Sequence, residues 1–291
     1  MLDLDDRLDE LAELGLHQRM RMVSGPQGPR VVLDGRPVLL LCSGNALGLA
    51  DHPRVRQAAA DAAMRWGVGA GAARVASGTM TLHRRLEERL AAFLSQRAAL
   101  LFGSGALANL GTIPALARRG EIVLFDELSH PSIQDGCRLS GAEAVPYRHT
   151  DADHLAWALR QADGRAALIA TDGMFGLDGD VAPLAEIVAL AREGFEVAGA
   201  YAHVVPLVVG DAEVAAAMAD HALEQGVFTE AVRPPAVPQG TARVRLAAMA
   251  SHTRAELRDA ARVLGRAALW AGFRPGAGVP VAAVQDLPRA A

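Results

Sequence analysis

The middle of the chain, from residue 98 to residue 192, alternates between two patterns of apolar residues. Short apolar runs typical of buried strands are separated by stretches in which apolar residues recur at helical spacing. The predicted strands cover residues 98–102, 121–125, 144–147 and 166–171, and the predicted helices cover residues 106–117, 132–140, 151–161 and 184–192. Such alternation implies a mainly parallel sheet with helices on both of its faces. We therefore expect an α/β fold for this region.

The two ends of the chain follow other patterns. Leu4, Leu8 and Leu11 recur at helical spacing among acidic residues, which predicts an amphipathic N-terminal helix. Apolar runs on both sides of the turn Asp34–Gly35 are typical of a hairpin. The other predicted elements are helices at 52–66, with its alanines facing inward, at 81–93, at 212–225 and at 251–271, and strands at 204–210 and 242–248. The elements after residue 195 predict a separate α+β layer.

The turn after the first of the central strands is a candidate binding site. Residues 103–105, Gly-Ser-Gly, lie between the apolar run 98–102 and the following helix. Free N–H groups and the helix dipole favour an anion at a helix start, and glycine allows it to approach closely, so this turn suits a phosphate. Residues 126–130, which end in His130, follow the carboxyl end of the next predicted strand, 121–125. Open α/β sheets bind ligands at this end of their strands. The alternative is an ordinary strand–turn–helix with a surface histidine.

A second glycine-rich stretch, residues 67–74, has spacing like that of a dinucleotide-binding turn. That fingerprint requires a strand immediately before it, whereas a predicted helix precedes this stretch. We therefore interpret it as a backbone-dense loop that leads to the helix at 81–93.

Composition excludes several classes of protein. The chain has 291 residues, is 51% hydrophobic and 21% charged, and carries a formal net charge of -4. It has no basic cluster interleaved with aromatic residues, so nucleic acid is not an expected partner. The acidic first residues do not resemble a signal peptide, and no apolar run reaches the length of a membrane span, so the expected compartment is the cytoplasm, with no membrane partner. Cys42 and Cys137 show no metal-binding spacing, and we expect reduced thiols and no metal site.

Lysine is absent from the chain. All 29 basic residues are arginine. Any mechanism that needs an ε-amino group from this chain is therefore excluded.

Six motifs occur in an order that resembles one family of enzymes. They are L-G-L at 47–49, the glycine run with Arg74 followed by His83 and Glu87, S-G-x-x-A-N at 104–109, D-E-L-S-H-P-S-I at 126–133, D-G-D-V-A-P-L-A-E-I at 178–187, and R-P-P-A-V-P-Q-G-T-A-R-V-R-L at 233–246. Nearly the whole chain resembles the pyridoxal-phosphate-dependent α-oxoamine synthases, and the last motif favours their 8-amino-7-oxononanoate synthases. The resemblance implies a fold-type-I transferase with a large cofactor-binding domain and a smaller α+β domain, in a family of homodimers.

This resemblance also implies roles for single residues. The backbone of Gly105 and Ala106 is expected at the phosphate of pyridoxal 5'-phosphate, and the His130 imidazole on one face of its pyridine ring. Arg233 is expected to bind the carboxylate of the amino acid, although without the family it is a solvated loop charge. The family reaction, in biotin biosynthesis, condenses L-alanine with a pimeloyl thioester, either pimeloyl-CoA or pimeloyl-carrier protein, and releases carbon dioxide.

The chain departs from the family pattern at several small residues and at one large gap. The small residues, which replace larger or polar family side chains, are Ala46, Ala106, Gly176 and Ala236. After the helix at 184–192, the family continues with a strand that bears an aspartate for the pyridine nitrogen, a strand whose lysine binds the cofactor, and a long helix. Here the residues from 195 match the C-terminal domain instead, so roughly a hundred residues are missing at ordinary element lengths.

We therefore expect an N-terminal helix and hairpin arm at 1–50, a truncated cofactor-binding domain at 51–194 and a C-terminal α+β domain at 195–291. The sheet after Thr171 is expected to be incomplete, cofactor binding to be weak, and no catalytic residue to be present. The expected function is that of an 8-amino-7-oxononanoate synthase, inactive as the chain stands. The alternatives are a non-catalytic protein that pairs with a complete paralogue, and an incomplete gene product.

Overall fold

The computed structural model describes residues 4–14, 20–177, 179–182 and 204–273. The chain divides into two compact units, of which unit 1 comprises Met1–Arg56 and Leu207–Ala291 and unit 2 comprises Gln57–Pro206. The predicted three-part division stays a prediction, and the helix predicted at 184–192 lies outside the described residues.

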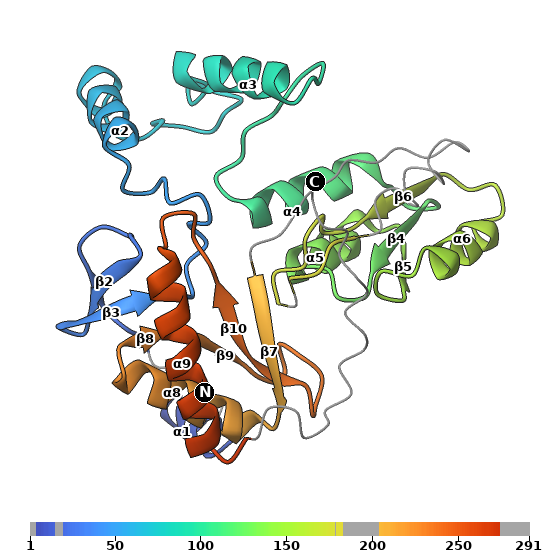
Figure 1. Cartoon of the computed structure of the whole chain (residues 1–291). Coiled ribbons are helices and arrows are strands. Elements are labelled where there is room, and N and C mark those ends of the chain that lie inside the picture. The colour runs from blue at the N-terminus through green and yellow to red at the C-terminus, as the bar shows by residue number, and fades with distance from the viewer. Residues whose placement is uncertain (1–3, 15–19, 178, 183–203, 274–291) are drawn as a thin grey trace, which may run out of the picture. The chain divides into compact units, whose positions relative to one another are not determined.

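In its described residues, unit 2 is built on a three-stranded parallel sheet in the order β5-β4-β6 (Figure 1). Its strands are β4 (Ile122–Asp126), β5 (Glu143–Tyr147) and β6 (Ala167–Ala170), and the helices packed on them are α4 (Gly105–Leu116), α5 (Pro131–Ser140) and α6 (Ala152–Gln161). Side chains of β4 alternate between two clusters, since Val123 packs with α4 and α5 while Leu124 packs with α6. Both side chains are completely buried. The prediction of a parallel sheet with helices on both faces is confirmed.

The apolar run 98–102, predicted as a strand, forms none. A strand needs a neighbouring strand for its backbone hydrogen bonds, and no described strand pairs with this run. Its backbone is paired with side chains instead: the Leu101 N–H donates to Glu87 Oε1 at 3.0 Å, and the Leu101 carbonyl accepts from Arg74 Nη1 at 3.2 Å. The prediction was wrong because apolar composition alone does not supply a strand partner.

Two helices precede this run, α2 (Pro53–Trp66) and α3 (Thr81–Phe93). Both were predicted, but α2 buries no residue at all, so the prediction that its alanines face inward is wrong. α3 buries only Glu87 and Ala91. Arg74 Nη2 donates to Glu87 Oε1 at 2.7 Å, so the glycine-rich loop at 67–74 is tied to α3 by an ion pair.

The described residues of unit 1 form two small sheets and three helices that lie wholly within it. The strand orders are β1-β2-β3-β8 and β7-β10-β9. The elements are α1 (Leu4–Glu13), β1 (Val23–Ser24), β2 (Arg30–Leu33), β3 (Arg36–Leu40), β7 (Val204–Gly210), α8 (Ala212–Glu224), β8 (Val227–Phe228), β9 (Glu230–Val232), β10 (Ala242–Ala247) and α9 (Arg254–Trp270). β2 and β3 form the predicted hairpin, in which Asp34 and Gly35 both have positive φ, as its tight turn requires.

The main core of unit 1 lies between β10 and the helices α8 and α9. Val244 of β10, Ala215 of α8 and Ala267 of α9 are completely buried there. α9 begins with a capping box, in which Thr253 and Glu256 bond each other's backbone N–H groups. The predicted α+β layer is therefore present.

No helix among the described residues is long and apolar enough to cross a membrane. Cys42 and Cys137 are both free thiols. Burial raises the pKa of Cys42 to about 12, so its reactive thiolate form is disfavoured. The described part of the chain also holds no group of histidine, cysteine or acidic side chains that suits a metal ion.

Candidate functional site

Polar side chains gather where the three parallel strands of unit 2 end. Asp126 is the last residue of β4, His149 follows β5 and Asp172 follows β6. Because the strands are parallel, these residues lie along one edge of the sheet, the edge at which such sheets bind ligands.

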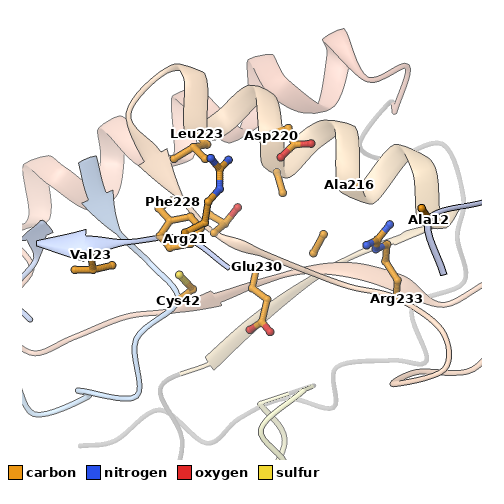
Figure 2. A pocket seen from close by; sticks show the side chains of 13 residues that line it. Ala12, Arg21, Val23, Cys42, Ala216, Asp220, Leu223, Phe228, Glu230 and Arg233 are labelled. Carbon is orange, nitrogen blue, oxygen red and sulfur yellow. The ribbon is translucent and has the colours of Figure 1, made fainter. Parts of the chain in front are cut away.

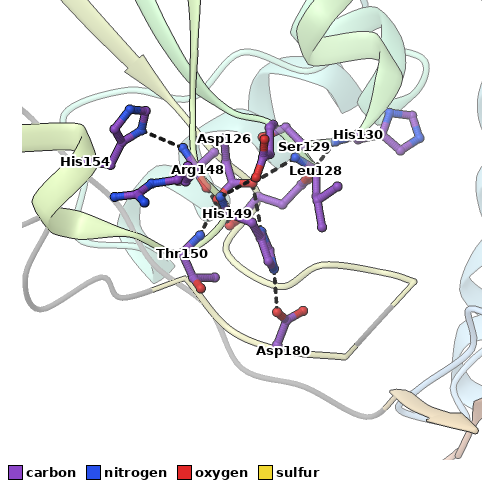
Figure 3. A network of polar contacts seen from close by, with 12 residues as sticks. Asp126, Leu128, Ser129, His130, Arg148, His149, Thr150, His154 and Asp180 are labelled. Carbon is purple, nitrogen blue, oxygen red and sulfur yellow. Dashed lines mark hydrogen bonds and ion pairs between the residues drawn. The ribbon is translucent and has the colours of Figure 1, made fainter. Parts of the chain in front are cut away.

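A network of hydrogen bonds centres on Asp126, which is 1% exposed (Figure 3). Asp126 Oδ1 accepts from the Leu128 N–H at 2.9 Å and contacts His149 Nδ1 at 2.8 Å, while its Oδ2 accepts from the Thr150 N–H at 2.8 Å. The other ring nitrogen of His149 contacts Asp180 Oδ2 at 2.6 Å. One imidazole therefore links the end of β4 to the loop that follows β6.

His149 is held in its charged form by this arrangement. Burial disfavours the charge, but hydrogen bonds to Asp126 and Asp180 outweigh burial and raise the pKa of His149 to about 9. The Phe175 ring lies nearly perpendicular to the imidazole, at 87°, with 4.4 Å between the two ring centroids. At neutral pH both ring nitrogens therefore donate, one to each carboxylate.

His130 is anchored to the same loop through its backbone. The His130 N–H donates to Asp172 Oδ2 at 2.6 Å. Burial raises the pKa of Asp172, and the hydrogen bond from His130 opposes that change. Figure 3 shows the His130 ring directed away from His149 and Asp180, so its face is not engaged in the polar network.

The His130 ring is oriented from the other side by Ser132. The Ser132 N–H donates to His130 Nδ1 at 3.2 Å, and Ser132 Oγ lies 2.7 Å from the same atom. Asn109 Nδ2 donates to Ser132 Oγ at 2.9 Å, so the hydroxyl proton is free to point at the ring. The Nδ1 atom of His130 therefore accepts a backbone N–H and caps the start of α5.

The predicted phosphate turn is the start of α4. Ser104 caps this helix by accepting the Leu107 N–H at 3.2 Å, and both Gly105 and Ala106 are exposed. A Cβ added to Gly105 meets no atom within 4 Å, so open space lies beside the helix start. Gly105 is one helical turn before Asn109, which reaches the Ser132–His130 pair.

The backbones of α4 and α5 approach closely beside this site. A Cβ added to Gly136 of α5 meets the Asn109 carbonyl oxygen of α4 at 2.9 Å. Only glycine permits this approach, which carries the Asn109 side chain to Ser132.

Arg233 lies in the other unit, at the end of β9. It lines a pocket of about 910 Å³ in unit 1, together with Arg21, Glu230 and Asp220 (Figure 2). Arg21 pairs with Asp34 at 2.9 Å, and Glu230 pairs with Arg245 at 3.0 Å. Among the described residues, none forms an ion pair or hydrogen bond with the Arg233 guanidinium.

The structure thus brings three of the four predicted site residues into unit 2 and leaves Arg233 in unit 1. Sequence reasoning missed the roles of Ser132, His149 and Asp172. The sequence His130–Pro131–Ser132 carries a signal for the first of these, because a histidine before Pro and Ser can cap the helix that they start. The contacts of His149 and Asp172 depend on strand register and leave no local signal.

Comparisons with known proteins identify the family. Residues 36–193 and 188–264 match the sequence model of aminotransferase class I and II. The chain belongs to this family. An 8-amino-7-oxononanoate synthase of Geobacter sulfurreducens is 34% identical over 375 residues, covering 89% of this chain and 96% of the relative. The synthase of Geotalea daltonii is 51% identical over 196 residues, covering 66% of this chain and 50% of the relative. The resemblance to 8-amino-7-oxononanoate synthases is confirmed.

Solved structures show the same fold. A serine palmitoyltransferase from S. paucimobilis, with a bound pyridoxal phosphate–myriocin aldimine, matches with a TM-score of 0.83 at 22% identity, over 92% of this chain and 97% of the other. The 8-amino-7-oxononanoate synthase of Francisella tularensis matches with a TM-score of 0.57 at 14% identity, over 81% of this chain and 99% of the other. Unit 2, with its parallel sheet, thus has the fold of the fold-type-I pyridoxal-phosphate enzymes.

Two features of these matches concern the family residues that are expected to be missing after the predicted helix at 184–192. The family match consists of two stretches that meet at residues 188–193. The alignment with the Geobacter sulfurreducens synthase is 375 residues long although this chain has 291 residues, so that relative contains residues with no counterpart here.

Proposed function

We propose that this chain is the cofactor-binding and amino-acid-binding frame of an 8-amino-7-oxononanoate synthase and that it forms no carbon–carbon bond by itself. One observation carries the proposal. The chain contains no lysine, yet it has an open helix start at Gly105 and an imidazole, that of His130, oriented by Ser132. We expect the ligands of this chain to be L-alanine and a pimeloyl thioester, and its compartment to be the cytoplasm.

The residues of unit 2 fit part of pyridoxal 5'-phosphate. The open start of α4 offers the backbone N–H groups of Gly105 and Ala106 to a phosphate, with the helix dipole behind them. When bound, this cofactor withdraws electrons from the Cα of an amino acid. The chain offers no lysine that bonds to the cofactor covalently, so binding is weak and reversible.

Three side chains of unit 2 orient the His130 imidazole, on which the pyridine ring of the cofactor is proposed to stack. Asn109 and Ser132 hold the His130 imidazole through its Nδ1 edge, and a planar ring stacks on a pyridine. Asp172 holds the His130 backbone. Together they present one planar face that is already oriented before any ligand arrives.

Arg233 of unit 1 binds the carboxylate of L-alanine in this proposal. A guanidinium matches a carboxylate with two parallel hydrogen bonds. Support comes from the absence of any ion pair to Arg233 among the described residues, while its neighbours Arg21 and Glu230 are already paired.

Loss of activity follows from groups that the chain lacks. A general base alone is typically worth about 10²–10⁴-fold in rate. Here the covalent lysine and the carboxylate for the pyridine nitrogen are both absent from the matched stretches, and groups that act as a unit fail together. Two observations support an internal deletion. The two family-matched stretches meet at residues 188–193, and the alignment with the Geobacter sulfurreducens synthase is longer than this chain. An incomplete gene product gives the same sequence, and resequencing across the codons for residues 192–195 separates the two.

Pairing of two chains is the second part of the proposal. α2 and α3 carry large exposed apolar side chains, including Met64 at 89% and Phe93 at 84%. Large apolar side chains left exposed in this way support an interaction with another chain. A homodimer, as in the family, or a pair with a complete paralogue covers it.

The test combines a binding measurement with an assay. Pyridoxal 5'-phosphate is titrated into the chain, and absorbance is recorded before and after borohydride treatment, followed by peptide mapping. We expect weak binding that His130→Ala weakens further, with no pyridoxyl adduct on an internal residue. The assay supplies L-alanine, pimeloyl-CoA and the cofactor, with the Geobacter sulfurreducens synthase as positive control, and seeks 8-amino-7-oxononanoate by mass spectrometry. Product above a heat-killed control, from protein whose mass confirms 291 residues, contradicts the proposal.

A further inference from the structure

His149 contacts both of the segments that position His130 (Figure 3). Its Nδ1 lies 2.8 Å from Asp126 Oδ1, and its Nε2 lies 2.6 Å from Asp180 Oδ2. Asp126 begins the short segment that leads to His130, whereas Asp180 belongs to the loop after β6. We call the described residues of that loop, 172–177 and 179–182, the β6 loop.

The first route from His149 to His130 runs through Asp126. The Asp126 carboxylate accepts the Leu128 N–H at 2.9 Å, and its backbone carbonyl accepts the Ser129 N–H, also at 2.9 Å. These two bonds hold the chain between the end of β4 and His130 in a tight turn. The Asp126 side chain that His149 contacts therefore also fixes the segment that delivers His130.

The second route runs through the β6 loop. Its two arms are joined by a hydrogen bond from the Phe175 N–H to the Asp180 carbonyl at 3.0 Å, and they also form an isolated β-bridge. Asp172, at the start of the loop, accepts the His130 N–H at 2.6 Å. A displacement of Asp180 is therefore transmitted along the loop to the residue that holds the His130 backbone.

The two carboxylates hold His149 unequally. Asp126 is 1% exposed and accepts two backbone N–H groups in addition, whereas the Asp180 side chain is 41% exposed. The other oxygen of Asp180 has no hydrogen-bond partner among the described residues. Within that part of the chain, His149 is the one polar group that holds the Asp180 side chain. The contact with Asp180 is thus the weaker of the two.

An imidazole can donate to two carboxylates at once only while it is charged. A charged ring has an N–H on each nitrogen, whereas a neutral ring has one N–H and one lone pair. The neutral form of His149 therefore presents a lone pair to one of its two carboxylates. Since Asp180 is the more exposed partner and can turn toward water, loss of the proton breaks the contact with Asp180.

The charged groups around His149 favour its charged form. The ionisable side chains that neighbour it from β4, from the chain after β5 and from the β6 loop are those of Asp126, Glu127, Arg148, Asp151 and Asp180. Arg148 pairs with Asp151 at 2.7 Å, and the other three are carboxylates. Burial opposes the charge, but hydrogen bonds to Asp126 and Asp180 outweigh burial and raise the pKa of His149 to about 9.

We propose that His149 is a positioning residue of the candidate cofactor site, because its charged ring ties the β6 loop to the end of β4 and so fixes the backbone of His130. When the ring loses its proton, Asp180 is released, the β6 loop moves, and His130 loses one of its supports. The inference rests on the proposed function in one step, namely that the His130 imidazole receives the pyridine ring of the cofactor.

NMR spectroscopy of the full chain tests the coupling without any ligand. The carbon-bound ring protons of His149, His130 and Phe175 are followed between about pH 7 and pH 10.5. We expect His149 to titrate near its pKa of about 9, and the other two rings to shift with the same midpoint. The methyl protons of Ile113, which is buried between α4 and α5, are the reference. A His130 signal that ignores the titration of His149, or an equal change at Ile113, overturns the proposal.

Two variants separate positioning from a general structural effect. Asp180→Asn removes the charge but keeps an oxygen that accepts an N–H from His149, so we expect the midpoints of His149 and His130 to fall together by at least about one pH unit. Asp153→Asn is the matched control, because it removes an exposed carboxylate of α6 that has no ion pair among the described residues, and both midpoints should stay unchanged. A His130 midpoint that stays near pH 9 in Asp180→Asn contradicts the proposal, since a merely structural role of Asp180 does not follow the charge of His149.

Titration with pyridoxal 5'-phosphate distinguishes this inference from the proposed function. The parent chain and Asp180→Asn are compared at the same pH, so that ionisation of the cofactor itself cancels. At about pH 8.5 we expect the variant to bind about threefold more weakly, because a smaller fraction of it carries the charged His149, and at about pH 6.5 we expect equal affinities. Coupling between His149 and His130 with no cofactor binding at any pH leaves the positioning role standing and removes the proposed function. Equal affinities at about pH 8.5, in samples that do bind the cofactor, remove the positioning role and leave the proposed function standing.

Discussion

α9 and α2 have similar amphipathic patterns but very different surroundings. α9 buries five residues in the main core of unit 1, next to α8, namely Ala260, Val263, Leu264, Ala267 and Ala268. α2 buries none, and its Met64 side chain is 89% exposed. Periodicity predicts that a helix forms, but the partner for its apolar stripe has to be supplied by the fold. α9 finds that partner within unit 1, whereas the described part of the chain supplies none for α2.

A cavity in α9 should destabilise the protein far more than the same kind of change in α2. Leu264→Ala removes a side chain that is 4% exposed, and such substitutions cost about 2–5 kcal/mol in free energy of unfolding. Met64→Ala is the matched control, and for the unpaired chain we expect a change within about 0.5 kcal/mol at this exposed position. Denaturant titration of both variants measures the difference. A large loss with Met64→Ala instead shows that α2 already has a partner in solution, such as a second chain.

An element of the fold could be predicted from the sequence when the residues that specify it are neighbours in the chain. α4 was predicted because the helical spacing of apolar residues at 106–117 and the Gly-Ser-Gly turn before it are neighbours in the sequence. The run 98–102 was wrongly predicted as a strand because a strand depends on a neighbour that composition does not reveal. The inward alanines of α2 were wrong for the same reason.

The candidate site shows the same division. The placement of Gly105 and Ala106 at a helix start, and of His130 at a strand end, was predictable from short motifs. The Asp126–His149–Asp180 network joins three segments that only the register of β4 and β5 and the fold of the loop after β6 bring together. No spacing in the sequence indicates such a contact, so the charge state of His149 was not predictable either.

The stability of unit 2 should fall as pH rises toward and beyond 9 because of His149. The pKa of this residue is raised to about 9 in the fold, against about 6.5 in an unfolded chain. Its contribution is therefore fully present below about pH 6.5 and is lost as pH rises through about 9. The full difference is on the order of 3 kcal/mol. Hydrogen exchange of the amides of β4 between pH 6 and pH 10, corrected for the intrinsic rate, measures it.

His149→Gln is the matched variant, because an amide reaches one carboxylate and does not titrate in this range. We expect the variant to be less stable at pH 6 and to lose the decline that the parent chain shows between about pH 7 and pH 9. An unchanged decline in the variant assigns the effect to another group. Unit 1 serves as a reference, since α9 is stabilised by apolar packing and its protection should depend less on pH.

The smallest expected effect compares the caps of two helices, one in each unit. Ser104 caps α4 and Thr253 caps α9, so replacing either with alanine should cost about 1 kcal/mol in the stability of its helix. The two variants should differ in ligand binding, because Ser104 orders the helix start that receives the phosphate, whereas Thr253 starts a helix that only packs. We expect Ser104→Ala to weaken the binding of pyridoxal 5'-phosphate several-fold and Thr253→Ala to leave it unchanged, as measured by calorimetric titration. Equal affinities in the two variants show that the start of α4 is not part of the cofactor site. Loss of the Ser104 cap changes the positions of the N–H groups at this helix start, so a phosphate bound by those groups has to bind more weakly.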